Sequence, residues 1–369
     1  MISDKNRKRI LFAGGGTAGH LMPAINIARE IGALNKEIEP HFVGKKSGME
    51  SRIVKSYGFE IDEIDVIGMR RTITGIMKFA VKWLTGYGQA KNIVNNISPI
   101  AVVGTGGYIS APVVKAAHRK GIPIFLQEQN SLPGLASRTL SKYALVIFTA
   151  YESAGKYLGR AKCMLIGNPV RTDITRADRA ESYKQLDLNP QMNTLLVLGG
   201  SSGAKTINSS LLNLIEGNRI PDNWQIIWQT GISDYELIES SLSPDECRIR
   251  VIAFIDDMPA AYAVSNLVIS RAGAMAISEI IAAGLPSVLI PYPHATGDHQ
   301  SLNAKFLEDS GAAIIIREKE IGNRFKDVIN DLFNNTQKRK LMSENARRLG
   351  KPEAARRIAE TILEKINEI

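Results

Sequence analysis

Several features that would place a protein in a special class are missing from this chain of 369 residues. It has only two cysteines, Cys163 and Cys247, which are too few for a disulfide framework and favour a reducing compartment. No apolar run approaches the roughly 20 residues that cross a bilayer. The charged N-terminal segment has its apolar stretch at residues 10–13 only, far shorter than the core of a signal peptide. The composition therefore predicts a cytoplasmic globular protein, and the length predicts two domains.

The first glycine-rich turn lacks a partner that a dinucleotide site requires. Gly14, Gly16 and Gly19 fill the fingerprint G-x-G-x-x-G. That fingerprint also needs an acidic residue at the end of the next strand to bind the ribose. The next predicted strand, residues 40–43, runs instead into a glycine and two lysines at 44–46. A nicotinamide-dependent dehydrogenase is therefore disfavoured, although it stays an alternative.

Two glycine-rich turns, at residues 14–20 and 199–204, each follow a predicted strand and precede a predicted helix. Glycines let the backbone approach a ligand closely, and the free N–H groups at the start of a helix favour an anion. Predicted strands alternate with helices at residues 9–13, 40–43, 100–103, 122–126, 145–149, 194–198, 225–229, 248–253, 266–270 and 287–290. We therefore predict an α/β protein with two Rossmann-like domains that face a cleft.

The turn at residues 167–171 is the predicted domain boundary. It separates a first domain at 1–168 from a second at 169–351, and an amphipathic helix within 352–369 is expected to pack back on the first domain. Residues 1–168 carry 23 Lys and Arg against 11 Asp and Glu, whereas the whole chain has a net charge of +9. This asymmetry indicates that the first domain meets an anionic surface, either nucleic acid or membrane.

Residues 70–84 are a candidate for that contact, because they form a basic amphipathic segment. One helical face carries Ile73, Ile76, Met77, Ala80 and Leu84, and the other carries Lys78 and Lys82. This pattern is typical of an interfacial membrane helix. A helix that faces the core and exposes its lysines is the more usual interpretation.

Other polar positions suggest ligand binding. A third glycine turn at 104–108 either forms a second N–H nest for a diphosphate or is only a tight turn. His20 is a candidate general base, phosphate donor or packing residue. Arg271, at a predicted helix N-terminus, suits a nucleotide diphosphate, and Glu279 either accepts both ribose hydroxyls or faces solvent. The loop at 291–300 lies where open α/β sheets bind ligands.

A metal site is not predicted. His294 and His299 have no supporting cluster of acids and histidines, and Asp256 and Asp257 are expected to cap the helix that follows them. No cofactor is expected either.

Taken together, these stretches resemble the MurG family, whose members transfer N-acetylglucosamine from UDP-N-acetylglucosamine to a lipid-linked muramyl-pentapeptide on the inner face of bacterial membranes. The matching stretches are 15–20, 104–112, 128–130, 167–171, 199–204, 254–258, 271–279 and 299–300, in the family order. The resemblance implies the glycosyltransferase-B fold and an inverting hexosyltransferase of peptidoglycan synthesis. It also implies a peripheral location on an anionic membrane surface, with no nucleic acid as partner.

The resemblance further implies a set of residues for the sugar nucleotide. Ile255 would meet the uracil through its backbone, and Glu279 the ribose. Ser201 and Arg171 would lie near the phosphates, where Arg271 would help to stabilise the departing diphosphate. Ala274, Met275, Ala276, Ile277 and Ser278 would line the nucleotide pocket, Gln300 would hold sugar hydroxyls, and Thr17, Ala18, Gly19 and Asn130 would close over the donor.

For the lipid-linked acceptor, the resemblance implies that Gly15, Gly16, Gly106 and Gly107 surround the diphosphate. Tyr108 and Glu128 would lie near the acceptor, and His20 would act as the base at the reacting centre.

Four positions depart from the family pattern. Ala18 replaces a common glycine, Gln127 a frequent histidine, Ala276 a hydroxyl residue and His299 a glutamine. Three alternatives to the transferase stay open. They are a UDP-N-acetylglucosamine 2-epimerase of the same fold, the dehydrogenase, and a nucleotide-sensing protein without catalysis.

Overall fold

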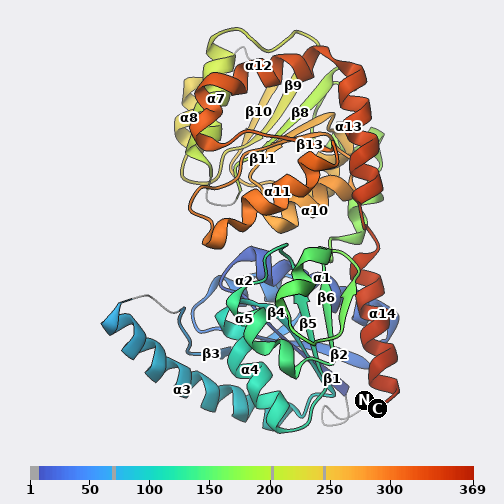
Figure 1. The fold of residues 1–369 in the computed structure, drawn as a ribbon. Coiled ribbons are helices and arrows are strands. Elements are labelled where there is room, and N and C mark those ends of the chain that lie inside the picture. The colour runs from blue at the N-terminus through green and yellow to red at the C-terminus, as the bar shows by residue number, and fades with distance from the viewer. Residues whose placement is uncertain (1–7, 69–71, 201–202, 244–246) are drawn as a thin grey trace. The chain divides into compact units, whose positions relative to one another are not determined.

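The computed structural model describes residues 8–68, 72–200, 203–243 and 247–369 (Figure 1). The chain divides into two compact units. Unit 1 comprises Met1–Val170 and Glu353–Ile369, and unit 2 comprises Arg171–Pro352. The expected boundaries were 168/169 and 351/352.

Unit 1 contains a parallel sheet of order β3-β2-β1-β4-β5-β6-β7. Its strands are β1 (Lys8–Gly14), β2 (Ile38–Lys45), β3 (Glu60–Ile64), β4 (Ala101–Gly106), β5 (Ile124–Glu128), β6 (Val146–Thr149) and β7 (Cys163–Leu165). The helices are α1 (Ala18–Leu34), α2 (Met49–Ser56), α3 (Ile73–Ile97), α4 (Gly107–Arg119), α5 (Leu135–Leu140) and α14 (Ala354–Asn367), with 3-10 turns η2 (Ser141–Tyr143) and η3 (Glu152–Tyr157). One core joins the sheet to α1 and α14, and a second joins it to α3 and α4.

Unit 2 contains a second parallel sheet, of order β10-β9-β8-β11-β12-β13. Its strands are β8 (Asn193–Leu198), β9 (Trp224–Gln229), β10 (Ile249–Ile252), β11 (Leu267–Ser270), β12 (Ser287–Leu289) and β13 (Ala313–Ile315). The helices are α6 (Arg179–Gln185), α7 (Lys205–Glu216), α8 (Tyr235–Ser241), α9 (Met258–Val264), α10 (Ala274–Ala282), α11 (His299–Asp309), α12 (Ile321–Asn334) and α13 (Thr336–Leu349). The 3-10 turns are η4 (Thr172–Thr175), η5 (Thr296–Asp298) and η6 (Glu318–Glu320).

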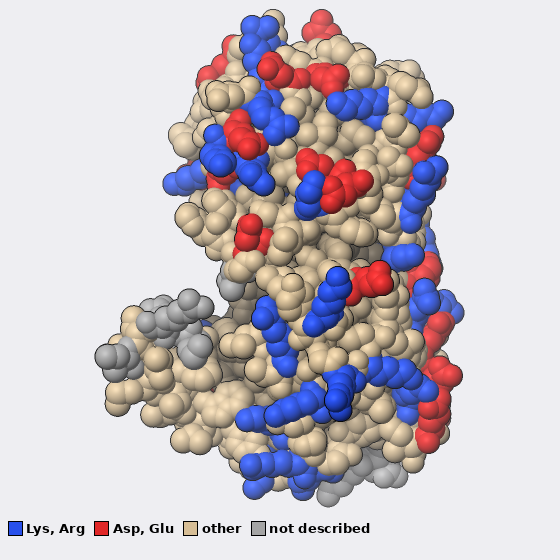
Figure 2. All heavy atoms as spheres, in the orientation of Figure 1, with Lys and Arg blue, Asp and Glu red and all other residues tan. Residues whose placement is uncertain are grey.

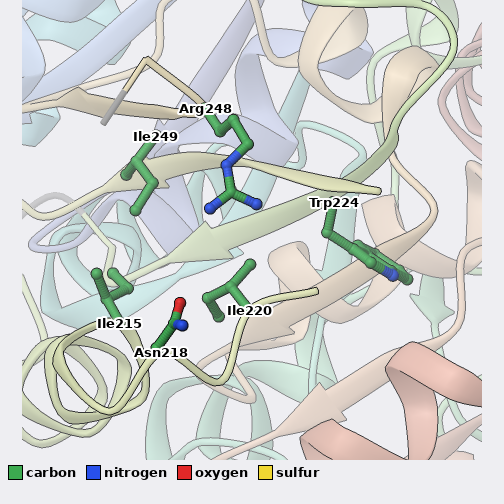
Figure 3. A pocket seen from close by; sticks show the side chains of 6 residues that line it. All are labelled: Ile215, Asn218, Ile220, Trp224, Arg248 and Ile249. Carbon is green, nitrogen blue, oxygen red and sulfur yellow. The ribbon is translucent and has the colours of Figure 1, made fainter. Parts of the chain in front are cut away.

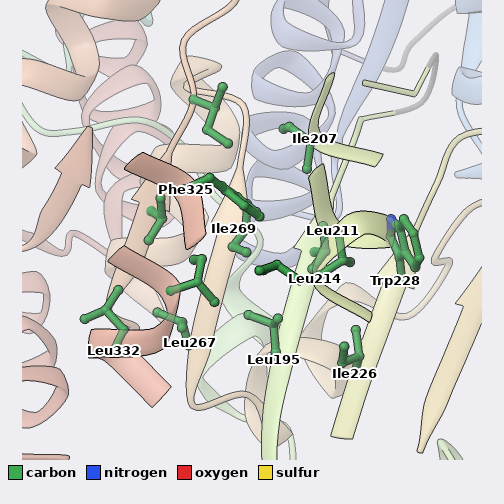
Figure 4. Close-up of a cluster of buried hydrophobic side chains, with 14 of the residues drawn as sticks. Leu195, Ile207, Leu211, Leu214, Ile226, Trp228, Leu267, Ile269, Phe325 and Leu332 are labelled. Carbon is green, nitrogen blue, oxygen red and sulfur yellow. The ribbon is translucent and has the colours of Figure 1, made fainter. Parts of the chain in front are cut away.

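The core of unit 2 is built from apolar side chains on the strands and on the helices that cover them. Leu195 and Ile269 from β8 and β11 meet Leu211 from α7 and Phe325 from α12 (Figure 4). Strands that are buried on both faces need continuous apolar runs, which is why residues 194–198 and 266–270 were recognisable as strands.

Both sheets reverse their strand order at one place, between β1 and β4 in unit 1 and between β8 and β11 in unit 2. Chains that leave such neighbouring strands go to opposite faces of the sheet, which opens a crevice at the carboxyl ends. The glycine-rich turns after β1, β4 and β8 lie at these places, and so does the turn after β11.

The predicted C-terminal amphipathic segment is helical. It forms α14, whose buried Ile358 and Ile362 join the core that also contains α1 and β1. No helix within the described ranges is long and apolar enough to cross a membrane.

The first turns of helix α3 expose their apolar face, whereas the more usual interpretation of the sequence pattern placed this face in the core. Its last turns bury Ala90 and Val94 against unit 1. Its first turns leave a strip of large apolar side chains in solvent, made by Ile76, Met77, Val81 and Leu84. A core-facing role for this part of the helix is therefore wrong. Arg70 and Arg71 lie outside the described residues.

Candidate functional site

In unit 1 the glycine turns after β1 and β4 enclose His20, which lies in the first turn of α1. A Cβ atom on Gly106 would come within 2.8 Å of His20 Nδ1, and one on Gly107 within 2.3 Å of the Gly15 carbonyl oxygen. Both glycines also have positive φ angles, +101° and +75°. Glycine is required here because the two turns approach each other around the imidazole.

The helices that start at these turns have N-termini without a side-chain cap. Thr17 is the N-cap of α1 and Gly106 that of α4. Neither residue accepts a hydrogen bond through a side chain from the N–H groups of the first turn. Helices such as α6 and α9 are capped by Asp178 and Asp257. Uncapped first-turn N–H groups at a strand-order reversal are suited to bind an anion such as a diphosphate.

The turn after β1 is fixed by a buried glutamate, Glu50, which was not predicted from the sequence. Glu50 on α2 accepts the Gly16 N–H through Oε1 at 2.5 Å. The Gly16 N–H is therefore engaged within the unit. The Tyr108 ring packs on the same turn, 3.0 Å from a Cβ built on Gly16. Burial, and secondarily the Glu50 carboxylate, raise the pKa of Tyr108.

Glu128 and Asn130 pair with each other at the end of β5. Glu128 Oε1 accepts from Asn130 N at 3.0 Å and from Asn130 Nδ2 at 3.2 Å, and its Oε2 accepts from Gly134 N at 3.2 Å. The buried carboxylate thus shapes the loop at 130–134. This contact makes Glu128 a loop-holding residue in the structure, rather than a group that is open to a ligand.

In unit 2 the predicted ribose carboxylate, Glu279, is half-buried on α10. It accepts from the Tyr262 hydroxyl at 3.1 Å. Burial raises the pKa of Glu279 to about 7, although Tyr262 and the nearby Arg171 lower it. The expectation of a solvent-facing glutamate is therefore wrong, since a strongly shifted carboxyl marks a desolvated site.

Arg171 lies close to this carboxyl and is itself oriented by an acid. Its Nε and Nη2 each lie 3.0 Å from an oxygen of Asp173, a bidentate ion pair. The N-terminus of α10 adds N–H groups, because its N-cap, Gly273, offers no side-chain cap. Ser201 lies outside the described residues.

The five residues predicted to line the nucleotide pocket divide by burial. Met275 and Ile277 are buried in unit 2, whereas Ala274, Ala276 and Ser278 are half-buried. Met275 and Ile277 are therefore core side chains that can meet a ligand only through their backbone. The Ile255 N–H donates to Gln229 Oε1 at 3.0 Å. We therefore expect the carbonyl of Ile255, and not its N–H, to contact the uracil ring.

Arg271 is anchored by contacts that the sequence did not indicate. Its Nη2 lies 2.9 Å from Glu318 Oε1, and its guanidinium stacks over the Tyr292 ring. Thr206, on α7, also donates to Glu318. Burial raises the pKa of Glu318, but the hydrogen bonds from Thr206 and Arg271 outweigh it and hold the pKa below its usual value. This arrangement makes Arg271 an organiser of the ligand-side loops of unit 2.

The loop after β12 is closed by Gln300. Its Oε1 accepts from Tyr292 N at 2.9 Å, which fixes the side chain at the start of α11. Gln300 is half-buried, so it lies on the surface of this loop. Asp257 caps α9 through a 3.0 Å bond from Ala260 N, which confirms the predicted capping role. The described ranges hold no group of three metal-binding side chains.

A small cavity in unit 2 lies at the end of the sheet opposite to the predicted nucleotide site. It is lined by Ile215, Asn218, Ile220, Trp224, Arg248 and Ile249 and holds about 10 Å³, space for one water (Figure 3). Trp224 and Ile249 begin β9 and β10, so the cavity lies at the amino ends of the strands. Ligands of open α/β sheets bind at the carboxyl ends.

Sequence reasoning missed the residues that act through hydrogen bonds to the predicted groups: Glu50, Gln129, Asp173, Tyr262 and Glu318. Only Gln129 had a local signal, its place directly after β5 beside the predicted Glu128. The other four come from elements without a ligand-binding pattern.

Comparisons with known proteins fit this geometry. A profile described as Glycosyltransferase family 28 N-terminal domain matches residues 10–149, and one described as Glycosyltransferase family 28 C-terminal domain matches residues 194–361. A relative from Halothermothrix orenii is 37% identical over 355 residues, which cover 93% of this chain and 95% of that protein. It is named UDP-N-acetylglucosamine--N-acetylmuramyl-(pentapeptide) pyrophosphoryl-undecaprenol N-acetylglucosamine transferase.

Among solved structures, that of Acinetobacter baumannii MurG has a TM-score of 0.76 at 28% identity and covers 97% of this chain and 99% of its own. A UDP-N-acetylglucosamine 2-epimerase structure has a TM-score of 0.66 at 14% identity and covers 98% of both chains, a likeness of fold alone. The comparisons therefore favour the transferase over the epimerase.

Two parallel-sheet α/β units, which match the N-terminal and C-terminal domains of glycosyltransferase family 28, define a glycosyltransferase of the GT-B fold. The similarity over nearly the whole length narrows this class further. The chain belongs to the MurG family.

Proposed function

We propose that this chain transfers N-acetylglucosamine from UDP-N-acetylglucosamine to N-acetylmuramyl-(pentapeptide) pyrophosphoryl-undecaprenol, the reaction in the name of its relatives. The observation that carries the proposal is the division of chemistry between the units. Unit 1 has a histidine enclosed by two glycine turns, and unit 2 has a desolvated carboxyl beside a helix N-terminus.

On the donor side, ionised Glu279 would accept the two ribose hydroxyls. Arg171, oriented by Asp173, and the uncapped N-terminus of α10 would stabilise the diphosphate. Gln300 would bind the sugar, and Thr17, Ala18 and Gly19 would approach the donor from unit 1. Arg271 and Glu318 would keep the surrounding loops in place.

On the acceptor side, His20 Nε2 would take the proton of the acceptor hydroxyl. The hydroxyl oxygen would form its bond to the anomeric carbon on the face opposite UDP, which inverts that centre. The bond from the anomeric carbon to the phosphate oxygen would break, and its electron pair would leave with UDP. The N-termini of α1 and α4 would hold the acceptor diphosphate near this base.

A His20→Asn variant tests the base. We expect kcat to fall by about 10²- to 10⁴-fold, because general-base catalysis contributes that much. The affinity for UDP should stay within about twofold of wild type, since Glu279 and Arg171 are unchanged. A variant with wild-type kcat would show that another group takes the proton.

We also propose that unit 1 binds the cytoplasmic face of the membrane through α3. Its exposed apolar strip is flanked by cations on α4, where Lys115 lies 5.3 Å from the Trp83 ring and Arg119 lies 5.3 Å from the Tyr87 ring. On the side in view, Figure 2 shows mostly basic charges around α4 and few charges on α3. Apolar side chains beside cations suit an anionic lipid surface.

Leu84 offers a sharp test, since it is 71% exposed and Leu237, on α8 of unit 2, is 70% exposed. Leu84→Ser combined with Ile76→Ser should weaken binding to vesicles that contain anionic lipid by about tenfold or more. The matched change Leu237→Ser should have no effect. Equal binding by both variants would contradict a role of α3. Lys82 is a poorer probe, because it pairs with Asp65 inside the unit.

A further inference from the structure

Beneath His20 lies a chain of three buried side-chain amides. Gln129, Gln127 and Asn168 come from the end of β5 and from the loop after β7, and all three are buried. His20 Nδ1 lies 3.1 Å from Gln129 Oε1. The imidazole thus joins a polar network, and among the described residues no carboxylate forms a hydrogen bond or ion pair with the ring.

The direction of every hydrogen bond in this network can be worked out from its acceptors. Gln129 Nε2 donates to the Thr105 carbonyl at 2.8 Å, to the Gln127 carbonyl at 3.3 Å and to Gln127 Oε1. A reversed Gln129 amide would place its oxygen against three other oxygens. Gln129 Oε1 therefore faces His20, and only a protonated Nδ1 can pair with it.

The rest of the chain fixes Gln129 in the same sense. Gln127 Nε2 donates to Asn168 Oδ1 at 2.9 Å, and Asn168 Nδ2 donates back to the Gln129 carbonyl at 3.1 Å. Asn26, on α1, holds the loop that carries Asn168 through a 2.8 Å bond to the Pro169 carbonyl. Each amide thus uses both its oxygen and its nitrogen, so that turning one amide around would break bonds at its neighbours.

We infer that Gln129 is the positioning residue of the base: it holds His20 as the Nδ1–H tautomer and leaves the lone pair of Nε2 for the acceptor hydroxyl. This inference rests on the proposed role of His20. In a serine-protease triad an aspartate fixes the histidine tautomer. Here a neutral amide, itself oriented by Gln127 and Asn168, does so without placing a charge beside the acceptor diphosphate.

The tautomer can be measured directly by nitrogen-15 NMR of histidine-labelled enzyme at about pH 8, with the His20 signal assigned from the His20→Asn variant. We expect protonated Nδ1 and unprotonated Nε2 in the wild type. Gln129→Leu should abolish this preference and lower kcat by about 100-fold, with the KM for UDP-N-acetylglucosamine little changed. Gln225→Leu, a matched change of a buried glutamine at the amino end of β9 in unit 2, should leave the spectrum and kcat as in the wild type.

A wild-type His20 protonated on Nε2 would overturn the inference, and so would a Gln129→Leu variant with the wild-type tautomer. The wild-type spectrum is decisive even if that variant fails to fold. A changed tautomer with unchanged kcat would support the role of Gln129 in orienting the ring. It would show at the same time that His20 is not the base. Failure of the proposed base is therefore distinguishable from failure of the inference about Gln129.

Discussion

Among single residues, Glu279 has the clearest electrostatic consequence. Its pKa of about 7 means that a large fraction of the protein carries it protonated near neutral pH. A protonated carboxyl offers one acceptor fewer to the two ribose hydroxyls of UDP. We expect the affinity of the wild type for UDP to fall by about tenfold between pH 8 and pH 6. In Glu279→Gln, affinity should be weaker at pH 8 and flat over this range, as calorimetric titration would show.

The same shift has a consequence for stability. The pKa of Glu279 is higher in the folded protein, about 7, than in the unfolded chain, about 4.5. Its contribution to the free energy of unfolding is therefore fully present below pH 4.5, and it is lost as the pH rises to about 7 and the buried carboxyl ionises. Glu279→Gln should therefore stabilise unit 2 by on the order of 2 kcal/mol at pH 8 and by almost nothing at pH 4. A thermal-shift series that gave the opposite trend would contradict a desolvated carboxyl.

Single residues also show which parts of the candidate site could be predicted from the sequence. His20 and Glu279 were predictable because each lies in the first or second turn of a helix that directly follows a strand. The partners that give them their chemistry, Tyr262 and Gln129, were not, because their side chains meet them only through tertiary packing. Asp173 sits two residues after Arg171, but such a spacing is common and marks no site by itself.

At the scale of elements, α14 links the end of the chain to unit 1. Ile358 is fully buried in the core with α1, so Ile358→Ala should cost about 2–5 kcal/mol. Hydrogen exchange should accelerate in the peptides of β1 and α1 and not in those of unit 2. The exposed neighbour Arg357 supplies a control, since Arg357→Ala should change exchange little. Faster exchange confined to unit 2 would contradict this packing.

The ten predicted strands are all present, with ends within two or three residues of those expected. Three strands were missed: β3, β7 and β13. All three lie at sheet edges, where a strand is buried less completely. The sequence of β3, Glu60–Ile64, carries three acids, and β7 and β13 have three residues each. Short or charged edge strands lack the apolar run by which central strands are recognised.

At the scale of the whole molecule, charge and glycine turns divide the chain in the same way. The basic excess lies within residues 1–168, in the unit proposed to meet the acceptor and the membrane. The first turn carries a dinucleotide fingerprint, yet its Gly16 N–H is taken by Glu50 and its histidine is held by Gln129. Its sequence resembles a cofactor loop, whereas its contacts are those of a loop that holds His20 in place.

Transfer of radiolabel from UDP-N-acetylglucosamine to a lipid-linked muramyl-pentapeptide tests the central claim most directly. The account predicts one labelled lipid product per UDP released, and loss of this product in His20→Asn with UDP binding retained. UDP bound without labelled lipid, or conversion of the donor to an epimer with the acceptor untouched, would contradict it.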